Sequence, residues 1–333
     1  MLSTDRFAAD SRPPARSGSA QVAVTVKRLW STHTCAIRVE SDRRAVAMRE
    51  VKFSAYRQYE DARVDANNSM IALLAGSRLA AHTLQLHADS PHQLPGLFPR
   101  VRDIDRFNLL PGRATELLHG ADAHLAAVAI PYALAVYEAF VLKVADLLEA
   151  DGAPVSRARG SMNAGRMHAT VYRAAQVDAP KDTIALFHVL RCLRNAQIHR
   201  AGLASKELVE VVSELSDDQQ RQWERLTMAP LAGWPEGKHI DFTVGHLIAA
   251  FAVTKEAARA LNETLQLALS RRFWAGLAVL DYAETAKPAR NSSGWKRGVL
   301  GFASFNYKAL NFTAAELETA AIEKGVWTGG AWS

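Results

Sequence analysis

The sequence predicts an all-α protein: a central bundle of long helices, with an N-terminal helical extension and a small C-terminal one. Apolar residues recur at spacings of three and four over several long stretches, which is typical of amphipathic helices. Hydrophobic residues make up 49% of the chain and charged residues 22%, the composition of a globular protein. Strand-like patterns are confined to residues 21–40 and to the ambiguous segment 206–215.

The first part of the chain divides at residue 20. Residues 1–20, dominated by Arg, Ser, Pro and Ala, are expected to form a disordered tail. Residues 21–111 are expected to form a mostly helical region, with a short hairpin over 21–40 and a helix from about 43 to 87. The three prolines in "DSPHQLPGLFP" (Asp89–Pro99) predict a loop.

The bundle is expected over residues 112–271. Its first segment, about 112–149, contains Pro131, which predicts either a kink or two helices with the proline in the first turn of the second. A basic loop with a short helix follows over 153–180, and then come long helices over about 180–202 and 243–271. Between these two, 216–226 reads as a capped polar helix.

Residues 272–333 are expected to form a small basic and aromatic subdomain. A short helix is predicted over 314–324, with Thr313 as its N-cap and Glu316 in its first turn. Two readings of the subdomain remain open: a surface that tracks a nucleic-acid backbone and stacks bases, or a packed unit with a charged exterior, which we favour. Its stretch 271–310 carries seven basic residues, Arg271, Arg272, Lys287, Arg290, Lys296, Arg297 and Lys308, against two acids, Asp281 and Glu284. Aromatic residues are interleaved with them, among them Trp274, Trp295, Phe302, Phe305 and Tyr307.

Several functional classes are disfavoured by composition. The two cysteines, Cys35 and Cys192, match neither zinc-site nor disulfide spacing, and no histidine pair has the spacing that places two metal ligands on one helix face, so we expect no metal and no cofactor. No secretory signal and no uncharged apolar run of membrane-spanning length is found, so we expect a cytoplasmic protein without a membrane partner. The net charge of +6 favours an anionic partner.

The most unusual run is "LRCLRNAQIHRAG" (Leu190–Gly202), near the predicted end of a bundle helix. On a regular helix Asn195 and His199 share a face, whereas Arg194 and His199 lie about 140° apart. Arg194 and His199 therefore cannot act together unless the helix loosens or another helix or subunit completes the site. A histidine can move a proton at an RNA 2′-hydroxyl, and an arginine can stabilise charge on a phosphate, so the pair could cleave RNA without a metal.

The stretch "LRNAQIH" resembles the R-x(4–6)-H signature of the HEPN superfamily (higher eukaryotes and prokaryotes nucleotide-binding domains), often seen as R-N-x-x-x-H near a helix end. The resemblance covers roughly Ala121 to Arg271. It implies an antiparallel four-helix-type bundle that forms a homodimer. It also implies a metal-independent endoribonuclease that acts as a toxin or an anti-phage defence effector and leaves 2′,3′-cyclic phosphate ends. RNA, and an antitoxin or other regulatory protein, would be the partners.

The resemblance implies catalytic roles for three residues. His199 would be the general acid/base, Arg194 the stabiliser of the transition state, and Asn195 a positioning residue. Three further residues are candidates for support: Glu138 would orient Arg194 or His199, and Arg191 and Arg200 would bind phosphates unless they are solvated surface arginines.

Two other hypotheses stay open. The chain could be a non-catalytic module that binds RNA, a nucleotide or a partner protein. It could also be a structural or interaction protein in which the motif is accidental, with Arg194 and His199 serving as cations at the negative end of the helix dipole.

Overall fold

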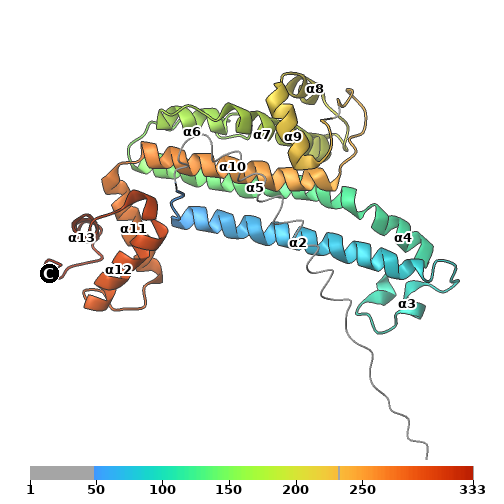
Figure 1. Ribbon diagram of the computed structural model, residues 1–333, viewed down its shortest axis with the longest axis horizontal. Coiled ribbons are helices and arrows are strands. Elements are labelled where there is room, and N and C mark those ends of the chain that lie inside the picture. The colour runs from blue at the N-terminus through green and yellow to red at the C-terminus, as the bar shows by residue number, and fades with distance from the viewer. Residues whose placement is uncertain (1–48, 232, 333) are drawn as a thin grey trace, which may run out of the picture. The chain divides into compact units, whose positions relative to one another are not determined.

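The computed structural model describes residues 49–231 and 233–332 (Figure 1). Within these ranges the chain is all-α, as predicted, with no β-strand. The tail predicted over 1–20 and the hairpin predicted over 21–40 lie outside the described residues. The helices are α2 (Ser54–Gln85), α3 (Leu94–Leu97), η1 (Ile104–Arg106), α4 (Pro111–His119), α5 (Ala121–Ala150), α6 (Met167–Ala175), α7 (Lys181–His199), α8 (Lys206–Ser213), α9 (Asp217–Thr227), α10 (Val244–Ala268), α11 (Arg271–Thr285), α12 (Ser293–Asn306), η2 (Lys308–Leu310) and α13 (Ala314–Glu323).

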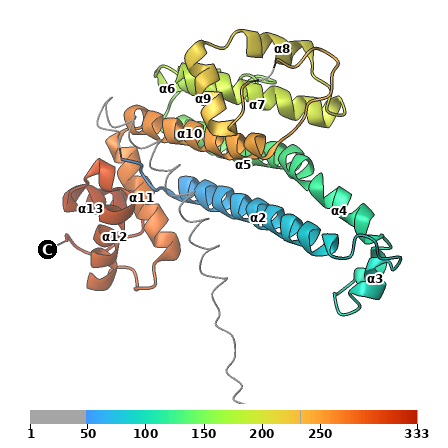
Figure 2. The ribbon, with the colours of Figure 1, turned by 45° about the vertical axis from the view of Figure 1, so that its right-hand side comes forward.

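Helices α5 and α10 form the centre of the unit that begins at Glu50, with α2 on one side of the pair and α7 on the other (Figures 1 and 2). Both central helices carry fully buried alanines, among them Ala126 and Ala129 on α5 and Ala257 and Ala258 on α10. Small side chains allow two helix backbones to approach closely, which explains the extensive contact between this pair. An apolar stripe along α5 is buried in the same core: Leu134, Tyr137, Val141, Val144 and Leu148.

The break in the first bundle segment falls at Gly120 and not at Pro131. Helix α5 continues through Pro131, so the alternative of a helix that starts at this proline is wrong. A proline inside a helix costs about 3 kcal/mol because it removes one hydrogen bond and crowds the preceding turn. Burial of Ile130 and Leu134 on either side of the proline offsets this cost.

The predicted fourth helix also ends early, at Ala268 instead of residue 271. Ser270 interrupts it because its hydroxyl caps α11 by accepting a hydrogen bond from the backbone N–H of Phe273. The same hydroxyl donates to Asp151 Oδ1 at 2.8 Å, which holds the turn against the end of α5. The ambiguous segment 206–215 is helical: α8 is capped by Ser205.

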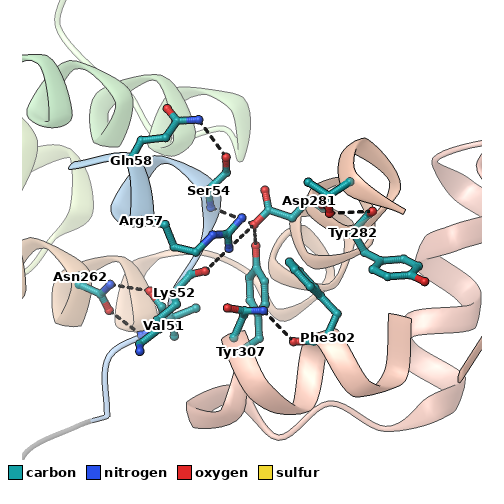
Figure 3. Close-up of polar contacts among 12 residues, drawn as sticks. Val51, Lys52, Ser54, Arg57, Gln58, Asn262, Asp281, Tyr282, Phe302 and Tyr307 are labelled. Carbon is teal, nitrogen blue, oxygen red and sulfur yellow. Dashed lines mark hydrogen bonds and ion pairs between the residues drawn. The ribbon is translucent and has the colours of Figure 1, made fainter. Parts of the chain in front are cut away.

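A buried polar cluster joins the start of α2 to the C-terminal helices (Figure 3). The side chain of Asn262 on α10 exchanges two hydrogen bonds with the backbone of Val51, at 3.0 and 2.7 Å. The Asp281 carboxylate, only 4% exposed, accepts hydrogen bonds from the Ser54 backbone N–H at 2.9 Å, from the Tyr307 hydroxyl at 2.5 Å and from the Arg57 guanidinium at 3.3 Å. One hydrophobic core therefore contains residues from all three regions expected from the sequence, 21–111, 112–271 and 272–333.

Helix α5 is the one helix of the described ranges that is long and apolar enough, by length and composition, to cross a membrane. Half of its apolar window is buried inside the protein, against α10, α2 and α7 among others. Packing in the core accounts for that half.

Candidate active site

Helix α7 carries the motif, and its buried face fixes how the motif residues are presented. Leu190, Leu193 and Ala196 are fully buried and anchor the last turns of the helix. Arg194 and Asn195 are half-buried at the edge of this face, and His199 is exposed as the last helical residue.

Arg194 forms an ion pair with Glu138 of α5, with 2.8 Å between Nη1 and Oε1. The two side chains are only 20% and 28% exposed. Arg194 Nε also lies 3.4 Å from the Asn195 Oδ1 that accepts its hydrogen bond. Burial raises the pKa of Glu138, and the neighbouring Arg194 opposes that rise. Glu138 thus holds the arginine of the motif in a defined position between two bundle helices.

His199 lies apart from this pair. Its imidazole is exposed, and it has no hydrogen-bond or ion-pair partner in the part of the chain that the structure describes. The side chain of Arg194 instead bonds Glu138 and Asn195, and on a regular helix it lies about 140° from His199. One chain therefore presents the arginine and the histidine of the motif separately.

The end of α7 is closed by a left-handed turn. Ala201 and Gly202 both have positive φ, 52° and 83°, and the Gly202 N–H donates to the carbonyl of Ala196 at 3.0 Å. The next residues pair with 237–240: the N–H of Ala204 donates to the carbonyl of Lys238, and the N–H of Ile240 to that of Gly202. A short bridge, Leu203 to His239, thereby fixes the chain beyond the motif.

His239 is a neighbour of the motif helix that sequence reasoning missed. Its Nδ1 lies 3.7 Å from the point where a Gly202 side chain would begin, and its imidazole is exposed. No local pattern could have found it, because the bridge joins segments that are distant in the sequence.

The conformation of Ala201 gives a testable prediction on stability. A residue with a Cβ in the left-handed region is strained by roughly 1 kcal/mol, whereas glycine is not. We expect Ala201→Gly to raise the free energy of unfolding by a few tenths to about 1 kcal/mol, measured by urea denaturation. Replacing Ala75, an exposed alanine in the interior of α2, by glycine is the control and should destabilise instead. A loss of stability for Ala201→Gly would contradict the strain argument.

The two supporting arginines differ in their surroundings. Arg191 is 13% exposed and pairs with Glu207 of α8, with 2.7 Å between Nη2 and Oε1. Its Nε donates to His188 Nδ1 at 3.3 Å, so Arg191 is a structural link between α7 and α8 and not a solvated surface arginine. Arg200 is exposed and makes no ion pair among the described residues, so it remains accessible to a phosphate.

Other titratable groups near α7 are unsuited to acid–base chemistry. Burial lowers the pKa of His168 to about 3, and its Nε2 lies 2.7 Å from the Tyr137 hydroxyl in the core. Burial likewise lowers the pKa of His188 and raises that of Cys192 to about 11. These groups stay uncharged near neutral pH. Among residues 49–231 and 233–332, no group of three or more His, Cys, Asp or Glu side chains is arranged to hold a metal ion.

The comparisons with known proteins add no relative: no family model, no curated protein and no solved structure matches the chain.

Proposed function

We propose that the chain is a metal-independent endoribonuclease of the HEPN type, acting in the cytoplasm as a toxin or an anti-phage defence effector. The observation that carries the proposal is the arrangement of α7. Arg194 is held by Glu138, and His199 lies exposed at the helix end without a partner among residues 49–231 and 233–332. An antitoxin or another regulatory protein would control such an activity.

The chemistry follows from the donors that these side chains leave free. A guanidinium has five N–H donors, and Arg194 uses Nη1 for Glu138 and Nε for Asn195, so its other amino group can approach a phosphate. His199 would move the proton of the 2′-hydroxyl, or protonate the leaving 5′-oxygen, while Asn195 positions Arg194. Attack by the 2′-oxygen on the adjacent phosphorus, with departure of the 5′-oxygen, leaves a 2′,3′-cyclic phosphate.

A second copy of the chain would bring an arginine and a histidine into one cleft. Helix α5 has an exposed apolar stripe on the side bordered by Glu138, with Val128 59%, Tyr132 47% and Leu142 43% exposed, and Ile198 of α7 is 54% exposed. Apolar stripes of this kind mark association surfaces. A homodimer that buries the stripe would place two copies of the Arg194–Glu138 pair near each other.

Placing a charge in the stripe should separate the copies. We expect Leu142→Glu to raise the dissociation constant of the dimer about tenfold or more and to lower RNA cleavage in parallel, because a buried carboxylate is costly to desolvate. The measurements are light scattering behind size exclusion and a cleavage assay over a range of protein concentrations. Leu267→Glu, at a 64% exposed position of α10, is the control. If the Leu142→Glu chain is monomeric and still cleaves at the wild-type rate, cleavage does not require an active site shared by two copies.

The nuclease proposal is tested by incubating a labelled RNA with the purified chain in EDTA. We expect cleavage to continue and the 5′ fragments to carry cyclic phosphates, which resist phosphatase until acid opens them. Absence of cleavage at every RNA class tried, or cleavage that EDTA abolishes, would overturn the proposal.

One observation favours a second candidate, a non-catalytic module that binds RNA, a nucleotide or a protein. The charge of Arg194 is already neutralised by Glu138, which is what a structural ion pair between α5 and α7 requires. In that case RNA binding would survive both Arg194→Lys and His199→Ala, and no cleavage product would appear.

A further inference from the structure

The C-terminal helices leave one aromatic ring open to solvent among basic side chains. Trp274, Trp295 and Tyr307 are at most 1% exposed and form the core of this part of the protein, as the packed-subdomain reading requires. Phe305 of α12 is the exception: it is 74% exposed. Burial in the core therefore does not explain the position of the Phe305 ring. Its neighbours at the surface indicate what the ring could bind.

One basic side chain, Lys52, lies over this ring, and two others follow or precede it on the same segment of chain. Lys52 Nζ lies 5.9 Å from the centroid of Phe305, and the backbone N–H of Lys52 donates to the carbonyl of Asn306 at 2.7 Å, which fixes the two segments side by side. Lys308 follows in η2, and Arg297 lies about 12 Å back along the axis of α12. All three cations are exposed and form no ion pair with an acid of the described residues.

The neighbouring acids are occupied elsewhere. Asp281 is buried and accepts three hydrogen bonds, whereas Glu316 and Glu323 pair with Arg271 and Arg272. None of these three acids therefore pairs with Lys52, Arg297 or Lys308. A fourth acid, Glu284 of α11, is exposed. Figure 3 shows that Lys52 itself lies beside the Asp281 cluster, which anchors the segment 51–57 to α10 and α11.

We propose that Phe305 and its three cations, Lys52, Arg297 and Lys308, bind a single-stranded nucleic acid. A base would stack on the free face of the Phe305 ring, and the cations would contact successive phosphates. Stacking on an aromatic ring within a basic surface is the usual way in which proteins hold single strands without reading sequence. The proposed binding surface does not depend on the nuclease function. Only the expectation that its natural ligand is RNA rests on that function.

The test measures the binding of a short fluorescein-labelled oligouridylate by anisotropy in the His199→Ala chain, which removes cleavage from the assay. We expect Phe305→Ala to weaken binding about tenfold, from the loss of roughly 1.4 kcal/mol of stacking, while Phe305→Trp binds at least as tightly as the parent. The pair Lys52→Gln and Lys308→Gln should weaken binding and lower the slope of log affinity against log salt by about 1.4.

A matched control exists near the other end of α2. Phe107 is 53% exposed beside Arg106, but there the arginines face Asp103. Phe107→Ala and Arg106→Gln should leave binding unchanged. An oligothymidylate should bind like the RNA, and a duplex should bind weakly because its bases cannot stack on the ring.

Each outcome decides one of the two proposals. Equal affinity of the Phe305→Ala and parent chains, with both folded by circular dichroism, overturns the binding surface even if the wild-type chain cleaves RNA. Weakened binding in Phe305→Ala supports the surface even if the wild-type chain cleaves no RNA, in which case the nuclease proposal alone fails.

Discussion

Replacing His199 by alanine is expected to lower RNA cleavage by about 10²–10⁴-fold, because the reaction loses its general acid/base. The exposed position of His199 at the end of α7, without a partner among the described residues, implies that its removal leaves the core unchanged. The rate is measured with a labelled RNA in EDTA under single-turnover conditions, and the fold is checked by thermal denaturation.

His82 provides a matched control, since it is also an exposed histidine in the last turn of a helix. His82→Ala should cleave at the wild-type rate. A His199→Ala chain that keeps more than about a tenth of the activity would exclude His199 as the acid/base. The next residue to replace would then be His239, which the bridge to Leu203 holds beyond the end of the same helix.

Replacing Asp281 by alanine is expected to lower the free energy of unfolding by about 3 kcal/mol. The change leaves the Ser54 N–H and the Tyr307 hydroxyl without an acceptor and removes the partner of Arg57. Because burial raises the pKa of this carboxyl, its charge is costly, so a neutral acceptor should replace it better than a methyl group does. We expect Asp281→Asn to lose less than half as much stability as Asp281→Ala.

Urea denaturation followed by circular dichroism gives both values. Glu284→Ala, at an exposed position one turn further along α11, is the control and should change the free energy of unfolding by less than about 0.5 kcal/mol. If Asp281→Ala is as stable as the wild type, the cluster of Figure 3 does not hold the start of α2 onto the C-terminal helices.

Elements whose signals are local were predicted well from the sequence. The capped helices α9 and α13 begin where Ser216 and Thr313 indicate, because each forms a capping box with a residue three positions later. The helix that carries the motif was placed correctly to within a few residues, since its apolar periodicity and the glycine after it both lie within the segment. These features depend on spacing along the chain, which the sequence contains completely.

Elements that depend on tertiary packing were predicted less well. The alternative in which Pro131 begins a second helix was wrong, because α5 continues through this residue, with Ile130 and Leu134 buried on either side of it. The end of α10 was misplaced because Ser270 caps α11 and begins a new helix, and the same hydroxyl also donates to Asp151, a long-range contact. No propensity or spacing describes a contact of this kind.

The candidate site divides in the same way. From the sequence alone came the all-α class, the motif Arg194-Asn195-x-x-x-His199 and the conclusion that its arginine and histidine point in different directions, since helical geometry sets that angle. Only the tertiary structure decided that Arg194 pairs with Glu138, that Arg191 is tied to Glu207, and that Phe305 is left in solvent beside Lys52. Each of these facts depends on which helices meet. That is determined by burial of the apolar faces of the whole chain and not by any one segment.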